Sequence, residues 1–306
     1  MQIVERVGGE ETQATARQRL KACWKHLRLP FQLTLSPIFL LGLFLARPSG
    51  VNLRALTAFV SMHFFLYTGI TAYNSFFDRD LGAVGGMERP PPATDALLPI
   101  SITLKTVGLV LAFFVGWVFA TVYSIFILLS FLYSHPRYRW KGSPCLSLAV
   151  VCGGQGVLGY LAGWAAARGE IVSVVSEAGV LGAVTAAFTV LGLYPLTQLY
   201  QRVEDRTRGD WTLAVTLGTQ QTIRLSQAAI AAAGIAGVLL ASKQLQIIDS
   251  VLLAAGFGGL VSAIEWLRLN IAHMSDGRLF RVVMRISYLS AAGFACFILV
   301  RIARWG

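Results

Sequence analysis

Two clusters of oxygen-donor side chains stand where long apolar segments run out into polar loops. The members are Asn74, Asp78 and Asp80 in the first cluster, and Gln201, Glu204, Asp205 and Asp210 in the second. Magnesium prefers oxygen ligands, and it commonly shares one or two carboxylates with the phosphate groups of a substrate. Carboxylates at the ends of membrane helices therefore predict a site at which Mg²⁺ ions hold a polyanion, most simply a diphosphate.

The spacing is the same in both clusters. Asn74 and Asp78 are four residues apart, as are Gln201 and Asp205, so each pair lies on one face of a helix end. A solvated charge at a membrane boundary would explain one cluster, but it gives no reason for the spacing to recur. The two helix ends are predicted to face each other across a cavity, where metal ions and basic side chains favour departure of a diphosphate. The 18 Phe, 9 Tyr and 7 Trp residues of the chain offer aromatic faces that exclude water and stabilise an allylic cation.

The composition indicates which elements position these clusters. The chain has 306 residues, of which 55% are hydrophobic and 13% charged, and its mean hydropathy is +0.63, so it is predicted to be an integral membrane protein. Apolar runs of near-spanning length occupy residues 31–46, 53–76, 100–118, 120–134, 145–166, 178–200, 221–241, 248–267 and 286–303. We therefore expect an all-α bundle of about nine transmembrane helices with a cavity that opens near the cytoplasmic face. The third and fourth helices are expected to meet in a short turn near Ala120.

The basic residues predict the orientation, because short cytoplasmic loops accumulate Lys and Arg. With an inside N-terminus, 20 of the 26 Lys and Arg residues fall on one side of the nine spans. The six on the other side are Arg47, Arg54, Arg168, Lys243, Arg301 and Arg304. The N-terminus and both acidic clusters are therefore predicted to be cytoplasmic.

Other classes of function fit the sequence less well. The net charge of +11 is scattered over the loop ends of a membrane bundle, which favours contacts with membrane lipid and argues against nucleic acid. The four cysteines are dispersed without metal-site spacing. Residues 1–30 are interpreted as a cytoplasmic tail with an interfacial helix around Cys23 to Leu29, and residues 31–306 as a single transmembrane helical domain.

With these clusters and spans, the chain resembles the UbiA superfamily of intramembrane prenyltransferases over essentially its whole length. That family has nine transmembrane helices and two Asp-rich motifs, NDxxDxxxD after helix two and DxxxD after helix six. Asn74 and Asp78 match the first motif, and Asp205 matches the second. Further similar stretches are Arg89-Pro90, Tyr133-Ser-His-Pro136 through Lys141, and Gly209 with Thr212-Leu213-Ala214 and Leu217-Gly218.

Three positions depart from the family pattern. Ser75 and Gly82 stand where the first motif has Asp, and Gln201 occupies the first Asp of the second motif. The site then has fewer carboxylates. Either acidic residues at shifted positions supply the missing ligands, namely Asp80, Glu204 or Asp210, or the site holds fewer ions.

The resemblance implies roles for these residues. Asn74, Asp78 and Asp205 are expected to be catalytic, with the two aspartates as the anchors of Mg²⁺. The candidate metal ligands are Asp78, Asp80, Glu204, Asp205 and Asp210. The candidate diphosphate contacts are Arg89 and Lys141 at motif positions, Arg28 just before the first helix, and Gln201, with lipid headgroups as the alternative partners of the basic residues.

The function that the resemblance implies is Mg²⁺-dependent ionisation of an isoprenoid diphosphate and transfer of the prenyl cation to an acceptor, which is commonly aromatic in this family. The main alternative is a UbiA-type terpene cyclase, in which double bonds of the prenyl chain attack the cation and no acceptor is needed. A transporter is a weaker alternative, because transporters place ionisable groups near the bilayer midplane, whereas the acidic residues here collect at one face.

Overall fold

The computed structural model describes residues 16–46 and 52–304, and the regular elements within these ranges are helices. The α-helices are α1 (Ala16–His26), α2 (Leu29–Gln32), α3 (Ser36–Leu45), α4 (Leu53–Val60), α5 (Tyr67–Asp78), α6 (Leu97–Val115), α7 (Trp117–Ser134), α8 (Pro144–Val151), α9 (Gly159–Arg168), α10 (Glu177–Leu199), α11 (Arg202–Arg208), α12 (Leu213–Gln244), α13 (Ile247–Asn270) and α14 (Asp276–Ala303). Two π-helical segments, η2 (Ser61–Leu66) and η4 (Cys152–Leu158), join α4 to α5 and α8 to α9. Short 3₁₀ segments are η1 (Leu33–Leu35), η3 (Trp140–Gly142), η5 (Val172–Val175) and η6 (Ile271–His273).

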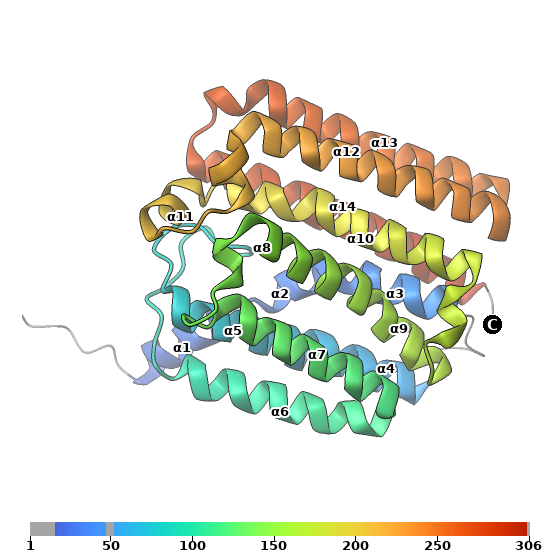
Figure 1. The fold of residues 1–306 in the computed structure, drawn as a ribbon, viewed down its shortest axis with the longest axis horizontal. Coiled ribbons are helices and arrows are strands. Elements are labelled where there is room, and N and C mark those ends of the chain that lie inside the picture. The colour runs from blue at the N-terminus through green and yellow to red at the C-terminus, as the bar shows by residue number, and fades with distance from the viewer. Residues whose placement is uncertain (1–15, 47–51, 305–306) are drawn as a thin grey trace, which may run out of the picture.

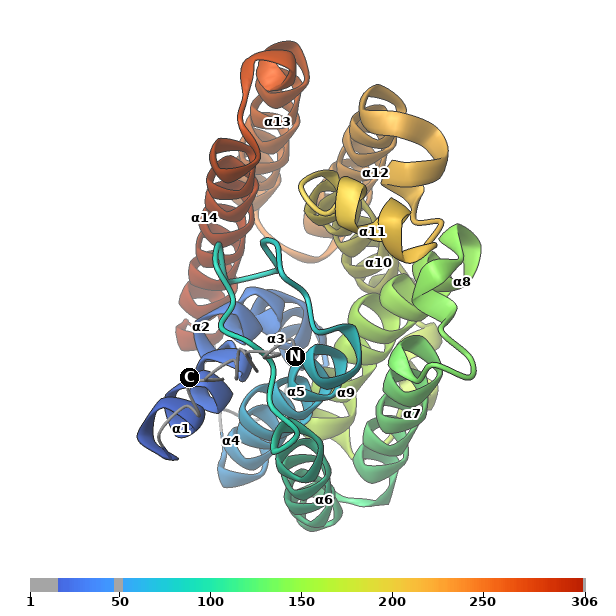
Figure 2. The ribbon, with the colours of Figure 1, turned by 90° about the vertical axis from the view of Figure 1, so that its left-hand side faces the viewer.

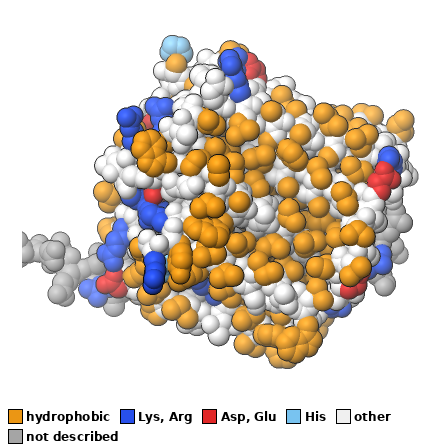
Figure 3. All heavy atoms as spheres, viewed as in Figure 1, with side chains coloured by type: hydrophobic (Ala, Val, Ile, Leu, Met, Phe, Trp, Pro, Cys, Tyr) orange, Lys and Arg blue, Asp and Glu red, His pale blue; other side chains and the backbone are white. Residues whose placement is uncertain are grey.

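Nine of the described segments are long and apolar enough to cross a membrane, which confirms the predicted all-α membrane bundle. They are Gln18–Leu45, Leu53–Asp78, Leu97–Val115, Trp117–Ser134, Pro144–Arg168, Glu177–Leu199, Leu213–Gln244, Ile247–His273 and Asp276–Ala303. Figure 1 shows these segments lying side by side, with α11 and the long connection after α5 gathered at one end. On the face shown in Figure 3, hydrophobic side chains cover the middle, and charged side chains lie at the two ends. A lipid bilayer fits this distribution.

Two hydrophobic cores hold the bundle together. The first is built mainly from residues of α3 to α7, α9 and α10, with single residues of α8, α12 and α14, and the second from residues of α10 and α12 to α14. Helix α10 belongs to both cores and packs against α12 and α3. Seen end-on in Figure 2, α14, α10, α7, α5 and the α2–α3 segment stand around a common centre. This arrangement places the ends of α5 and α10 at the same end of the molecule.

Three helix boundaries differ from those predicted. The turn between α6 and α7 falls at Gly116, which has a φ of 141°, and not near Ala120. Helix α12 begins at Leu213, eight residues before the predicted start, and Gly218 at φ 73° interrupts it. Helix α14 begins at Asp276, ten residues before the predicted start. The apolar runs delimit the part of a helix that faces hydrocarbon, whereas the hydrogen-bonded helix continues into polar residues.

The predicted division of the chain at residue 30 stays a prediction. Helix α1 overlaps the interfacial segment expected around Cys23 to Leu29, and α2 follows from Leu29. Residues 1–15 of the predicted tail lie outside the described residues.

Two glycines allow α3 and α9 to pack backbone to backbone. A Cβ atom added to Gly42 would overlap the carbonyl group of Tyr160, and one added to Gly163 would overlap the carbonyl group of Phe39. Backbone atoms cannot move aside as a flexible side chain can, so these positions admit only hydrogen at Cα.

We expect Gly42→Ala to destabilise the protein by about 1–3 kcal/mol, the usual cost of overpacking a core. Gly258→Ala in α13 is the matched control, because a Cβ at Gly258 meets nothing within 4 Å, and it is expected to leave stability unchanged or slightly raised. Thermal unfolding of the detergent-purified variants measures both effects. Equal unfolding temperatures for the two variants would contradict the close packing of α3 on α9.

Candidate active site

The first acidic cluster lies at the end of α5. The helix ends at Asp78, and Arg79 adopts a left-handed conformation (φ 49°) that turns the chain away. The carboxylate of Asp78 is buried and forms an ion pair with Lys141, and Nη1 of Arg139 lies 3.7 Å from its Oδ1 atom. One turn earlier, Oδ1 of Asn74 accepts a hydrogen bond from the Ser134 hydroxyl over 3.3 Å. The four-residue spacing thus places the amide and the carboxylate on one face, as predicted.

The second cluster is carried by the short helix α11 and the turn that follows it. Asp205 is buried, and one of its oxygens accepts a hydrogen bond of 3.2 Å from the hydroxyl of Thr212. Burial raises the pKa of Asp205 to about 7, and nearby Lys141 opposes the rise. Near neutral pH a cation that binds this carboxylate therefore competes with a proton.

Two arginines join the clusters. Arg139 donates from Nε and Nη2 to the two oxygens of Asp210, each over 2.7 Å. Arg208 donates to Asp80 over 2.7 Å and to Glu204 over 2.9 Å. Such charge-assisted and bidentate pairs fix orientation as well as charge. The loops after α5, α7 and α10 are therefore held together by ion pairs across the polar end.

A small polar pocket of about 80 Å³ lies between these loops. Eight of the predicted site residues line it, and they are Arg28, Asn74, Asp78, Asp80, Lys141, Gln201, Asp205 and Asp210. Residues from four separate segments of the chain thus converge on one pocket. This convergence is what the recurrence of the two clusters predicted.

Glu204 and Arg89 do not line the pocket. The two carboxylate oxygens of Glu204 accept hydrogen bonds from the backbone N–H groups of Leu81 and Gly82, over 2.9 and 3.0 Å. Glu204 thereby ties the loop after α5 to α11. The side chain of Arg89 is exposed, and it forms no ion pair or hydrogen bond with another described residue.

Arg28 has a distinctive setting. Its backbone is left-handed (φ 52°) between α1 and α2, and its buried guanidinium donates to the Ser75 hydroxyl over 2.8 Å. A second, longer bond of 3.4 Å reaches the carbonyl of Gly85. Ser75, which stands where the family motif usually has Asp, therefore holds a buried cation at the edge of the polar pocket.

Arg139, Arg208 and Thr212 were not among the predicted site residues, although the pocket or its ion pairs include all three. The available signal was their position in the sequence. Arg139 lies between Tyr133 and Lys141, Arg208 lies between Asp205 and Asp210, and Thr212 begins a stretch that is similar to the family. Basic residues are common in such loops, and only the folded chain distinguishes those that turn inward.

The donor set fits Mg²⁺. The four pocket aspartates offer carboxylate oxygens, and Oδ1 of Asp78 is buried beside Lys141 and Arg139 without a well-directed hydrogen bond. Among the described residues, no group of three or more acidic, His or Cys side chains could hold an ion by itself. Mg²⁺ usually completes its shell with water and substrate phosphate, so one or two carboxylates per ion suffice.

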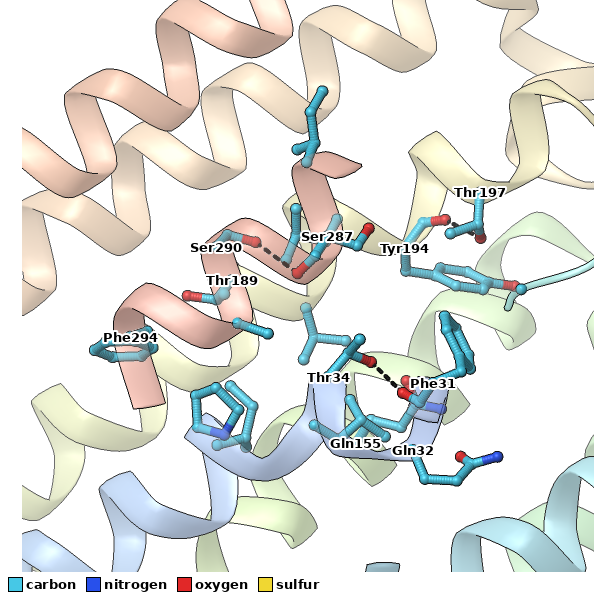
Figure 4. A pocket seen from close by; sticks show the side chains of 18 of the residues that line it. Phe31, Gln32, Thr34, Gln155, Thr189, Tyr194, Thr197, Ser287, Ser290 and Phe294 are labelled. Atoms are coloured by element: carbon cyan, nitrogen blue, oxygen red, sulfur yellow. Dashed lines mark hydrogen bonds between the residues drawn. The ribbon is translucent and has the colours of Figure 1, made fainter. Parts of the chain in front are cut away.

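A much larger cavity of about 1030 Å³ opens beneath the polar pocket. Its lining is mainly apolar and comes from α2, α3, α5, α7, η4, α10, α13 and α14, as the selected side chains in Figure 4 illustrate. The residues that line both spaces are Arg28, Asn74, Gly85, Tyr133, Tyr194, Thr197 and Gln201. A molecule with a polyanionic head and an apolar tail fits the pair of connected spaces.

Comparisons with known proteins agree with this architecture. The UbiA prenyltransferase family model matches residues 35–289. A curated relative, protoheme IX farnesyltransferase of Aeropyrum pernix, is 29% identical over 166 residues, which cover 52% of this chain and 54% of that protein. The match therefore spans about half the length of this curated relative.

Two solved structures of a UbiA homologue from Archaeoglobus fulgidus have the same fold. The structure bound to DMAPP and Mg²⁺ aligns with a TM-score of 0.64 and 18% identity, over 92% of this chain and 99% of that chain. The structure bound to GPP and Mg²⁺ aligns with a TM-score of 0.63 and 17% identity, over the same shares.

Proposed function

Because the chain belongs to the UbiA prenyltransferase family, we propose that it ionises an isoprenoid diphosphate with the help of Mg²⁺ and transfers the prenyl group to an acceptor, which we expect to be aromatic. The observation that carries this proposal is the junction of two spaces, a polar pocket with four aspartates and an apolar cavity of about 1030 Å³. The diphosphate is assigned to the polar pocket and the prenyl chain to the cavity.

The chain's own residues have distinct roles in this proposal. Arg28 and Lys141 face the diphosphate and stabilise the negative charge that grows on it as the carbon–oxygen bond breaks. Asn74 and Gln201 line both spaces and orient the head of the substrate at their junction. Aromatic side chains of the cavity wall, among them Tyr133, exclude water and stabilise the allylic cation until the acceptor attacks it.

The charge balance of the polar pocket supports a need for metal. Its four aspartates are matched by Arg28, Lys141, Arg208 and the adjacent Arg139. The protein therefore offers no surplus positive charge for a diphosphate. Mg²⁺, when bound to Asp78 and Asp205 and assisted by Asp80 and Asp210, supplies that charge and Lewis-acid polarisation of the leaving group.

The same balance gives a direct prediction. Removal of divalent cations with EDTA is expected to abolish pyrophosphate release from an isoprenoid diphosphate, and added MgCl₂ is expected to restore it. Potassium chloride at matched ionic strength is the control for screening. Unchanged pyrophosphate release in EDTA would show that the reaction does not need a divalent cation.

The active-site end is assigned to the cytoplasmic side, because the basic residues of the chain concentrate in the loops at that end. Cysteine accessibility tests this orientation in intact cells. A single Cys placed at exposed Arg137 should react with an impermeant maleimide only after the membrane is opened.

The experiment that tests the function uses purified protein, Mg²⁺ and geranyl, farnesyl or geranylgeranyl diphosphate, with and without an acceptor. Farnesyl diphosphate and iron protoporphyrin IX are tested first, because a curated relative is a protoheme IX farnesyltransferase. Acceptor-dependent pyrophosphate release with a prenylated product supports the proposal. Cyclic terpenes formed without an acceptor would show instead that the protein is a terpene cyclase.

A further inference from the structure

Two polar groups in the part of the cavity wall formed by α5 and η4 have no hydrogen-bond partner among the described residues. They are the side-chain amide of Gln155 and the hydroxyl of Tyr67, neither of which forms a hydrogen bond with a described residue. Other hydroxyls of the wall are satisfied locally. Each of these hydroxyls donates to a backbone carbonyl in the preceding helical turn. The bonds run from Thr34 to Phe31 (2.6 Å), Thr189 to Thr185 (2.7 Å), Ser287 to Val283 (3.0 Å) and Ser290 to Ser287 (3.0 Å).

The ring of Tyr67 is fixed in place. Tyr67 is only 2% exposed, and its ring packs edge to face against His63 at 5.3 Å and Phe126 at 5.8 Å between centroids. Its hydroxyl lies 3.4 Å from the position that a Cβ of Gly159 would occupy. The hydroxyl therefore lies at the boundary between η4 and α9.

Gln155 reaches the cavity from the same part of the wall. It lies four residues before Gly159, within the π-helical segment that leads directly into α9. Figure 4 shows Gln155 among the labelled lining side chains, close in this view to Thr34 of η1. The amide and the Tyr67 hydroxyl thus both line the cavity, and each lies within about one helical turn of Gly159.

The positions of both side chains depend on a π-helical backbone segment. Tyr67 follows η2 directly, and Gln155 lies within η4. A π-helical turn changes the direction of the side chains that follow it, and such turns occur frequently at functional sites. Two separate spans depart from α-helical geometry at the point where their polar side chains meet the cavity.

An isoprenoid chain cannot satisfy these groups, because it carries no hydrogen-bond donor or acceptor. A polar group left without a partner in an apolar space destabilises the protein. The region is also remote from the diphosphate, since 11 residues of α5 separate Tyr67 from Asp78, or about 16 Å along the helix. The matching ligand is therefore the second substrate, entering with a polar group pointed away from the reacting carbon.

Building on the proposed function, we propose that Gln155 and Tyr67 form the binding site for the remote polar group of the acceptor. The acceptor then belongs to a definite class. It carries a carboxyl, carbonyl or hydroxyl group at the end opposite to the carbon that receives the prenyl chain.

The test compares full-length wild-type protein with Gln155→Leu and Tyr67→Phe, which remove the polar groups with little change of shape. Thr189→Val is the matched control, because its hydroxyl lines the same cavity but already donates to the carbonyl of Thr185. The probes are iron protoporphyrin IX, 1,4-dihydroxy-2-naphthoate and 4-hydroxybenzoate. Binding is followed by quenching of tryptophan fluorescence, without any prenyl diphosphate.

At least one probe is expected to bind the wild-type protein saturably. Gln155→Leu should weaken that binding about tenfold and Tyr67→Phe about fivefold, the loss of one hydrogen bond each. Thr189→Val should leave it unchanged. The unfolding temperature of Gln155→Leu should stay equal or rise, because an unpaired amide is replaced by an apolar group.

The result that overturns the inference is the absence of saturable binding of all three probes, or equal binding by wild type and Gln155→Leu. Pyrophosphate release from farnesyl diphosphate is measured on the same samples. If the wild type releases pyrophosphate but the variants bind a probe normally, the proposed acceptor site at Gln155 and Tyr67 is wrong, whereas the proposed function is retained. If no sample releases pyrophosphate, the function itself is wrong, and the binding data are interpreted separately.

Discussion

Asp78→Asn and Asp205→Asn are each expected to reduce pyrophosphate release from an isoprenoid diphosphate by about a thousandfold. Each substitution keeps the size of the side chain and removes one carboxylate from the polar pocket. The neutral amide binds Mg²⁺ weakly, so the charge of the departing diphosphate is no longer neutralised. Steady-state kinetics with a coupled pyrophosphate assay, repeated over a range of MgCl₂ concentrations, measures the loss.

Asp95→Asn is the matched control. Asp95 lies in the connection after α5, its side chain is 87% exposed, and it pairs only with Arg79 at the surface. An exposed pair contributes little to stability or to the site, so activity should stay near that of the wild type. Similar activities for Asp95→Asn and both site variants would exclude the proposed metal ligands.

A loss of activity must be separated from a loss of folding. Asp78→Asn leaves Lys141 without its partner in a buried position, whereas Asp205→Asn keeps the hydrogen bond from Thr212 available to the amide oxygen. Thermal unfolding of both variants therefore accompanies the kinetics. Agreement between the two variants in activity, despite different stabilities, assigns the effect to the missing carboxylate.

The topology of the fold was predictable because the bilayer imposes it. Each span needs about 20 apolar residues, and nine such runs are visible in the sequence, so the number and order of the helices follow from composition. The turn at Gly116 was placed near Ala120 because apolar residues continue without a break through residues 110–120. Hydropathy does not register a single glycine that changes the backbone direction.

The site was predictable where residues act in pairs at helical spacing. Asn74 and Asp78 reach the pocket from one face of the end of α5. Gln201 and Asp205 also reach it, but α10 ends at Leu199, so this pair lies at the start of the separate helix α11 and not at the end of the sixth span, as was predicted. Glu204 has the same chemistry as its neighbour Asp205, yet it bonds the backbone of the loop after α5. Which of two adjacent carboxylates turns inward depends on the rotation of α11 against that loop, and no local pattern encodes that rotation.

Gln155 was beyond prediction for a related reason. In the sequence it stands among glycines of an apolar run, where small residues indicate close helix packing. Its exposure to the cavity depends on η4, and a π-helical turn leaves no periodic signal in one sequence. The side chain proposed to recognise the acceptor therefore lies where α-helical periodicity does not predict which side chains face the cavity.

Lys141→Met is expected to lower kcat for pyrophosphate release by about a hundredfold, the effect of removing one preorganised group that stabilises developing charge. Lys141 is buried in η3, paired with Asp78, and its charge also favours the ionised form of Asp205. Without its ammonium group the two anchor carboxylates lose their shared cation, so burial raises the pKa of Asp205 further and a proton competes more strongly with Mg²⁺.

This second consequence distinguishes a role in the site from a structural one. The MgCl₂ concentration that gives half-maximal activity should rise in Lys141→Met, and a higher pH should partly restore it as Asp205 loses its proton. Arg137→Met is the control, because Arg137 lies in the same loop with an exposed side chain, and it should change neither kcat nor the response to MgCl₂. A normal kcat with a normal MgCl₂ response in Lys141→Met would show that the lysine serves only as a counter-ion, and the diphosphate contact would then rest on Arg28 alone.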